Sequence, residues 1–304
     1  MRTRLAYVSF FFLWLLSTAL LWRPFAETLR LALTDSEFTH ILLILPISTA
    51  LILSQWNAAK PTPSWNPWMG SSLGATGVLI ALSARWWLGP TRPDVRLSVE
   101  MMALLIFWIA AFALAFGTMA VRSMLFPLGF LSWMVPLPSF LLLRIVEILQ
   151  RGSAVAAGLL FSAFGVPILR QGFVLSIPGL NLEVARECSS IRSSLILLIT
   201  TMVLAHVLLR TVWRKTLVVA IAVPLSVAKN GLRIFTLGML ATRVDPSFLT
   251  GRLHHEGGGV FFSVALALIV LLVWLLHRAE ARALVPGFSN DRSRADGLAY
   301  CRPH

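Results

Sequence analysis

Residues 190–209, SIRSSLILLITTMVLAHVLL, decide the fold of this chain. The stretch is apolar after its first turn, and it is about as long as a helix must be to cross a hydrocarbon core of about 30 Å. Similar runs recur along all 304 residues, of which 57% are hydrophobic and 13% charged, and the mean hydropathy is +0.80. This composition predicts an all-α polytopic membrane protein.

Eight stretches are candidate membrane spans, and Trp residues at many of their ends are typical of interfacial anchors. The first stretch starts with Arg2 and Arg4 and lacks a convincing small-residue cleavage site, so we expect a retained span and not a signal peptide. We expect residues 1–285 to form a single membrane domain and residues 286–304 to form a polar, mobile tail. The candidate spans are residues 5–22, 41–56, 71–87, 101–117, 123–143, 190–209, 215–240 and 259–277.

The segment between the fifth and sixth spans has a different pattern. From residue 144 to 165, polar side chains such as Glu147 and Gln150 stand among apolar ones in an amphipathic arrangement, which predicts a helix lying on the membrane. From residue 166 to 185, Pro and Gly residues separate short β-prone pieces. This part predicts a small β-hairpin on the outer face of the helix bundle.

The distribution of positive charge along the chain favours contact with membrane lipid. The formal net charge is +13, but the basic residues are scattered over loops and helix ends, which is typical of contacts with anionic head groups. We therefore expect membrane lipid, and no nucleic acid, as a partner. The two cysteines, Cys188 and Cys301, have neither a disulfide framework nor metal-ligand spacing, so we expect no metal and no cofactor. Cys301 lies in the polar tail and is expected to be incidental.

Helix geometry brings a thiol, an arginine and a histidine to one membrane face. At about 1.5 Å per residue, the helix that follows Cys188 covers about 33 Å by Arg210, so these two residues lie on opposite faces. The next helix returns to Arg233, and His255 follows before the last span begins. We therefore expect Cys188, Arg233 and His255 on the same side of the membrane, whichever side that is.

These three residue types suit acyl transfer at a peptide bond. Neighbouring cations favour the thiolate of Cys188, which is the nucleophilic form of a cysteine. An imidazole such as that of His255 can return a proton to the leaving amine. A guanidinium such as that of Arg233, always charged, can hold the developing oxyanion.

Each member of the trio also has a simpler interpretation. A single cysteine in a membrane helix is more often a small apolar packing residue than a nucleophile. Arg233, together with Lys229 and Asn230, can serve as an interfacial anchor of its helix. His255 can be an ordinary loop histidine, and His254 next to it competes for the same role.

Local charges favour a cytoplasmic amino terminus, although the Lys and Arg on the two sides are nearly balanced. The favourable signals are the basic start of the chain, the cluster between the sixth and seventh spans, and the basic residues after the last span. This topology puts both termini in the cytoplasm and the trio on the outside. The residues concerned are Arg2, Arg4, Arg210, Arg214, Lys215, Arg278 and Arg282.

The chain resembles the exosortases, multi-span bacterial membrane enzymes of the exosortase/archaeosortase group, over about residues 126–262. Motifs in a specific order and spacing carry the resemblance: FPLGFL at 126–131, PLP at 136–138, LQ at 149–150, GVP at 165–167, CSSIRS at 188–193, NGLR at 230–233 and HEGGG at 255–259.

The resemblance implies that Cys188, Arg233 and His255 are the catalytic residues. The histidine motif of the family, with an acidic residue directly after the histidine and a glycine four positions later, selects His255 over its neighbour. Four residues in or beside the same motifs are expected to bind substrate or support the trio: Arg192, Asn230, Glu256 and His254. Ser190 departs from the glycine that usually follows Cys-Ser, which can narrow the approach to the thiol. The stretch SEFTH at 36–40 looks like a weaker form of a family Tyr-Ser-His pattern, and we assign His40 no catalytic role.

The implied function is that of a cysteine peptidase or transpeptidase of the bacterial inner membrane, with its active site facing the periplasm. Its expected substrates are exported proteins with a carboxy-terminal sorting signal: a short motif such as Pro-Glu-Pro, a membrane helix and a basic cluster. Cleavage would proceed through a thioester on the cysteine. Two alternatives from other classes stay open, a transporter or channel and a non-catalytic assembly factor of exopolysaccharide export. Ionisable groups crowd helix ends here, which disfavours a transporter.

Overall fold

The computed structural model describes residues 2–59, 67–88, 91–184, 191–245, 247 and 258–284. The predicted site residues Cys188, His254, His255 and Glu256, and the tail at 286–304, lie outside these ranges. The helices are α1 (Arg2–Leu20), α2 (Trp22–Thr34), α3 (Ile41–Ala59), α4 (Pro67–Trp87), α5 (Pro93–Ser123), α6 (Leu125–Phe130), the 3-10 helix η1 (Leu131–Met134), α7 (Ser139–Ala163), α8 (Ile191–Leu208), α9 (Val212–Arg243) and α11 (Gly258–Leu284). The strands are β1 (Leu169–Gln171), β2 (Val174–Ile177) and β3 (Leu180–Glu183).

The predicted all-α membrane fold is confirmed. Within the described ranges, α5, α8, α9 and α11 are each long and apolar enough to cross a membrane, and counting each of two bent helix pairs as one span gives up to six. The predicted number of eight spans is not reached by length and composition, and it stays a prediction.

The two bent pairs differ from the predicted straight spans. α1 and α2 meet at 78°, so the first span continues into an amphipathic helix that we did not predict. α6 with η1 meets α7 at 96°. This second bend interrupts the predicted span 123–143, because Pro136 and Pro138 restrict the residues before them to extended backbone and remove backbone donors.

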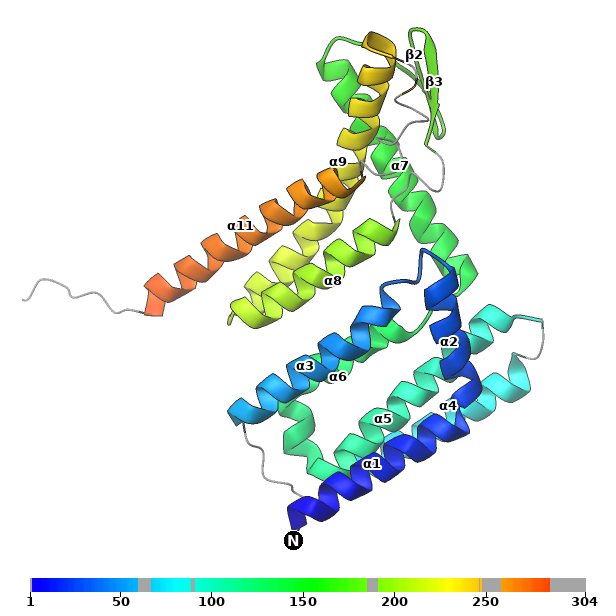
Figure 1. Ribbon diagram of the computed structural model, residues 1–304, viewed down its shortest axis with the longest axis vertical. Helices are drawn as coiled ribbons and strands as arrows, with labels where there is room; N and C mark the ends of the chain where they lie inside the picture. The colour runs from blue at the N-terminus through cyan, green and yellow to red at the C-terminus, as the bar shows by residue number, and fades with distance from the viewer. Residues whose placement is uncertain are drawn as a thin grey trace, which may run out of the picture.

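The helices form two groups that meet at α8 (Figure 1). In the first group α1 and α4 pack on α5, while α3 packs on α6 and η1. In the second, α7 packs on α9, and α8, α9 and α11 pack on one another. α8 joins the two groups, since Ile199 belongs to the buried core of the first and the His206 ring stacks on Phe126 at 3.8 Å between centroids.

The β-prone segment folds as a three-stranded antiparallel sheet in the order β1-β2-β3, one strand more than the predicted hairpin. In the register, Leu175 pairs with Arg170 and Leu182, and Ile177 pairs with Leu180. Leu175 is fully buried against α7 and α9 in a core that includes Phe161. The sheet therefore lies at one end of the α7–α9 pair (Figure 1).

A buried carboxylate holds the opposite end of the second group. Glu280 of α11 is 7% exposed, and its carboxylate accepts hydrogen bonds from the backbone N–H groups of Arg210 (2.9 Å) and Thr211 (3.0 Å). Arg214 reaches the carbonyl of Leu276 at 3.0 Å. These bonds satisfy donors at the N-terminus of α9, where negative charge is favourable, and they place the Arg210–Arg214 cluster at the end of α8 away from Ser193.

Candidate functional site

α8 and α9 are joined by a buried polar contact near the start of α8. Lys229 of α9 is 7% exposed, and its ammonium donates a hydrogen bond to the hydroxyl of Ser193 at 2.5 Å. Ser193 lies in the first turn of α8, five residues after Cys188. An ammonium inside a membrane helix is costly unless it is paired, so this contact marks the start of α8 as a polar site.

The polar face of α7 supports the same region. Asn230 is 1% exposed, and its amide donates to the hydroxyl of Ser153 at 2.9 Å. One turn earlier on α7, the buried side chain of Gln150 donates to the carbonyl of Val184 at 2.9 Å. Val184 also donates its own N–H to the carbonyl of Phe173 at 2.9 Å. The chain is therefore held immediately before residues 185–190, and Ile191 is buried immediately after them.

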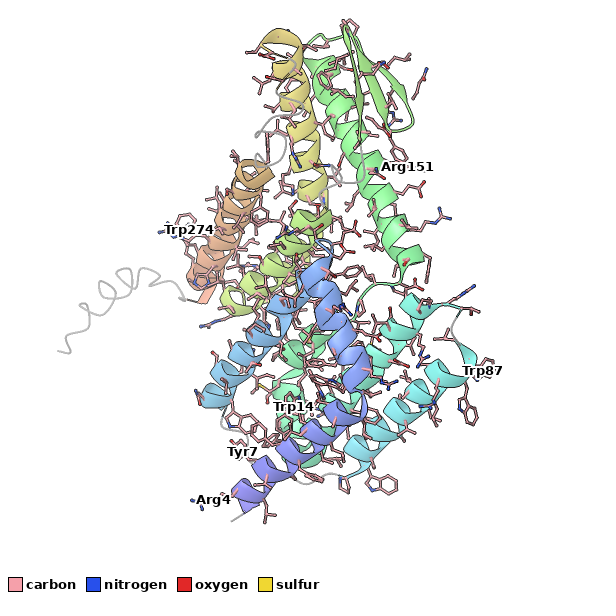
Figure 2. The ribbon with its side chains drawn as sticks, turned by 45° about the vertical axis from the view of Figure 1, so that its right-hand side comes forward. Arg4, Tyr7, Trp14, Trp87, Arg151 and Trp274 are labelled. Carbon is pink, nitrogen blue, oxygen red and sulfur yellow. The ribbon has the colours of Figure 1, made fainter. Side chains whose placement is uncertain are left out.

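Charged residues also lie on the exposed side of α7. Arg151 and Arg144 form ion pairs with Glu147 at 2.5 and 3.4 Å, and Arg151 lies on the outer side of α7 in Figure 2. The segment is helical and packs on α9, but its exposed side carries apolar residues such as Ile148 and Leu159 beside the charged ones, so it is less amphipathic than predicted. Its predicted position on the membrane surface stays a prediction.

A close backbone approach positions α9 against α7 beside Asn230. A Cβ atom at Gly231 would lie 2.5 Å from the Cβ of Ala156 and 3.0 Å from the backbone nitrogen of Ala157. Real Cβ contacts are not that short, so only glycine allows the two helices to come this close. The small residue explains why the amide of Asn230 reaches Ser153.

Arg233 lies where α11 begins. Its side chain is half-buried, and its Nη1 and Cζ atoms are 3.7 and 3.9 Å from the Cβ position at Gly258. Gly258 is the first residue of α11 and follows His255 by three residues. Arg233 follows Lys229 by one helical turn, so it lies near the end of α8 that carries Ser193.

Arg233 lies well inside α9, as it does in the predicted span 215–240. α9 continues for ten residues to Arg243, alongside α7 and the sheet (Figure 1). Arg233 therefore lies inside α9 but at the level where α8 and α11 start. The predicted span ends three residues before the helix does, because the apolar pattern weakens after Leu240.

Of the seven predicted site residues, Arg192, Asn230 and Arg233 are described. Asn230 is a buried hydrogen-bonded residue, Arg233 adjoins Gly258, and Arg192 is exposed as the second residue of α8. The convergence of all three predicted catalytic residues stays a prediction, since two of them are outside the described ranges. Within those ranges, no group of three or more His, Cys, Asp or Glu side chains is placed to hold a metal ion.

Four residues that hold the site together were not among the predicted site residues. Two of them, Gln150 and Ser153, share the face of α7 that packs on α9, and the other two form the contact between α8 and α9. The available signal was their polarity among apolar neighbours at helical spacing. The four residues are Gln150, Ser153, Ser193 and Lys229.

The site combines cationic groups with a supporting frame of neutral hydrogen bonds. Lys229 and Arg233 come from successive turns of α9, and Arg192 comes from the first turn of α8. Such a group can stabilise negative charge on a thiolate or an oxyanion in surroundings partly shielded from water.

One of three comparisons with known proteins finds a match. The family model of the transmembrane exosortases matches residues 30–271, which is most of the chain. The matched region includes α3 to α9 and the first half of α11. No curated protein and no solved structure matches the chain.

Proposed function

Because the chain belongs to the transmembrane exosortase family, we propose that it is a cysteine peptidase or transpeptidase with Cys188 as its nucleophile. The observation that supports this most is the position of Arg233 within 4 Å of the Cβ position at Gly258, near the start of α8. Cys188 precedes α8 by three residues and His255 precedes α11 by three residues. Both residues therefore need only short connections to approach Arg233.

In the proposed reaction, the thiolate of Cys188 attacks the carbonyl carbon of the scissile peptide bond. The guanidinium of Arg233 stabilises the oxyanion of the tetrahedral intermediate. As the C–N bond breaks, the imidazolium of His255 gives its proton to the leaving amine, and a thioester remains on Cys188. Water or an acceptor amine then attacks the thioester, His255 takes the proton of that nucleophile, and the thiolate is regenerated.

The supporting residues have distinct proposed roles. Asn230, through Ser153, fixes the turn of α9 that carries Arg233. Arg192 adds positive charge near the thiol. Glu256 and His254 flank the base and are proposed to bind substrate or to orient His255.

The proposed topology has eight spans, both termini in the cytoplasm and the three-stranded sheet on the outer face of the bacterial inner membrane. The proposed substrates are exported proteins with a short motif, a membrane helix and a basic cluster at the carboxy terminus. In this arrangement the motif reaches the start of α8 just outside the bilayer, while the helix of the substrate stays in the lipid beside the enzyme.

Co-expression with a tagged protein that carries such a sorting signal tests the proposal. We expect the wild-type chain and the control Cys301→Ser to shorten the substrate, as measured by immunoblot and by the mass of its mature terminus. We expect Cys188→Ala, inserted into membranes at the same level, to leave the substrate at full length. Shortening by Cys188→Ala would contradict the proposal.

A further inference from the structure

The first helix group contains a cleft that the proposed site does not use. Its volume is about 460 Å³, and α1, α3, α5, α6 and η1 all contribute to its wall. α1 packs on α5 while α3 packs on α6 and η1, so the cleft lies between α1 and α3. Phe11 and Leu53, which line it, are 55% and 59% exposed, and the cleft is therefore open toward the lipid.

The wall of the cleft matches a hydrocarbon ligand. It is formed mainly by aromatic and aliphatic side chains. Three polar side chains in it are already bonded inside the protein: Ser48 donates to the carbonyl of Pro127, Thr49 to that of Leu45, and Trp108 to the hydroxyl of Thr18. A polar ligand would find few partners here.

The volume of the cleft suits a single alkyl chain of a lipid. A membrane-spanning helix about 30 Å long and about 10 Å across occupies on the order of 2,000 Å³. That is several times the 460 Å³ available, whereas clefts of about 300–1,000 Å³ suit a single small ligand. The cleft is therefore too small to enclose the membrane helix of a substrate, whereas its size suits one alkyl chain.

One end of the cleft carries the marks of a head-group region. The rings of Tyr7 and Trp56 meet edge-to-face there, with 6.2 Å between centroids, and such amphipathic rings prefer the membrane–water interface. Arg4 is one turn beyond Tyr7, on the helix face that also presents Phe11 and Trp14. Figure 2 labels Arg4, Tyr7 and Trp14 along α1. Arg4 is exposed and forms no salt bridge with any carboxylate of the described residues.

From this arrangement we infer that the cleft binds one chain of an anionic membrane lipid, with the phosphate of the head group at Arg4. The chain lies between α1 and α3 and runs from Tyr7 toward Trp14 and Leu131. This inference does not depend on Cys188 or on the proposed peptidase activity.

Native mass spectrometry of the detergent-purified full chain tests the inference with two probes, dioleoyl phosphatidylglycerol and dioleoyl phosphatidylcholine. We expect one phosphatidylglycerol to bind about fivefold more tightly than phosphatidylcholine, as one surface arginine provides. Arg4→Gln should remove this preference, and Arg85→Gln, at the end of α4, should keep it.

A second pair of variants tests the cleft itself. Thr49→Phe adds a ring to the wall and should weaken binding of both lipids. Thr76→Phe is the matched control, because Thr76 also bonds the carbonyl four residues before it on an exposed helix face, but lies outside the cleft. If Thr49→Phe does not fold, Leu53→Trp replaces it, because this change also adds a ring to the wall of the cleft.

Equal binding of the two lipids by the wild-type chain would overturn the inference. So would unchanged lipid binding by the folded cleft variant. Binding of a 20-residue polyleucine membrane peptide that is lost only in the cleft variant would also overturn it, because the occupant would then be a helix.

Discussion

The ammonium of Lys229 in α9 donates a hydrogen bond to the hydroxyl of Ser193 in α8 at 2.5 Å, and both residues lie within the membrane helices. The contact joins the turn before Arg233 to the first turn after Cys188. Any movement of α8 along α9 would therefore change the position of the proposed nucleophile relative to the proposed oxyanion partner.

We expect Ser193→Ala to destabilise the protein by about 1–3 kcal/mol, because it leaves the buried ammonium with one acceptor fewer. The double variant Ser193→Ala/Lys229→Met should lose much less unfolding free energy than the sum of the losses in the two single variants, since no charge is then left unpaired. Thermal unfolding of the four proteins in detergent measures this coupling. Additive effects would show that the two side chains do not interact.

Gly231→Ala should be among the most disruptive conservative changes in α9. Its added methyl group would meet the backbone of Ala157 at 3.0 Å and the Cβ of Ala156 at 2.5 Å, so α7 and α9 must separate. We expect a loss of about 1–3 kcal/mol in the free energy of unfolding.

Gly74→Ala in α4 is the matched control, because nothing lies within 4 Å of its Cβ position. There the better helix propensity of alanine should leave stability unchanged or raise it by up to about 1 kcal/mol. Equal midpoints of thermal unfolding for the two variants would show that the close approach at Gly231 does not limit packing.

Arg233→Ala should lower the rate of substrate cleavage by about 100–1,000-fold, as expected when an oxyanion partner is lost. Arg233→Lys should restore little of it, since an ammonium does not reproduce the planar guanidinium. The control is Arg243→Ala, an exposed arginine ten residues later on the same helix. Cleavage at the wild-type rate by Arg233→Ala would exclude the proposed role.

His40 should make stability depend on pH. Burial lowers the pKa of His40 from its ordinary value of 6.5, although its contact with the carbonyl of Glu37 acts in the opposite direction. The unfolded chain therefore takes up a proton at higher pH than the folded chain, so this contribution to stability is lost as the pH falls below about 6.5. Between about pH 7.5 and about pH 5, the melting temperature of His40→Gln should fall less than that of the wild type. An equal fall in melting temperature for His40→Gln and the wild type would contradict this prediction.

Most helices could be predicted because a run of apolar residues must be helical where no water can satisfy the backbone. The predicted ranges 71–87 and 190–209 lie almost entirely within α4 and α8. The bends could not be placed in the same way. A hydropathy pattern does not distinguish a straight span from one that turns, and the turn before Trp22 depends on how α2 packs on α5 and α3.

For the site, the helix lengths from Cys188 to Arg210 and back to Arg233 were enough to predict that α9 returns to the start of α8. The partners of Asn230 and Gln150 were not predictable, because they are Ser153 on α7 and Val184 directly after β3. Contacts between segments so far apart in sequence depend on the packing of α7 against α9, and that packing depends on Gly231.

The most direct test of the account is the capture of the thioester on Cys188. Membranes containing the enzyme and a tagged substrate are treated with neutral hydroxylamine, which attacks thioesters, and the new carboxy terminus of the substrate is identified by mass spectrometry. The account predicts a substrate hydroxamate with the wild-type enzyme and with Cys301→Ser, and none with Cys188→Ala. A hydroxamate or a cleaved substrate with Cys188→Ala would contradict it.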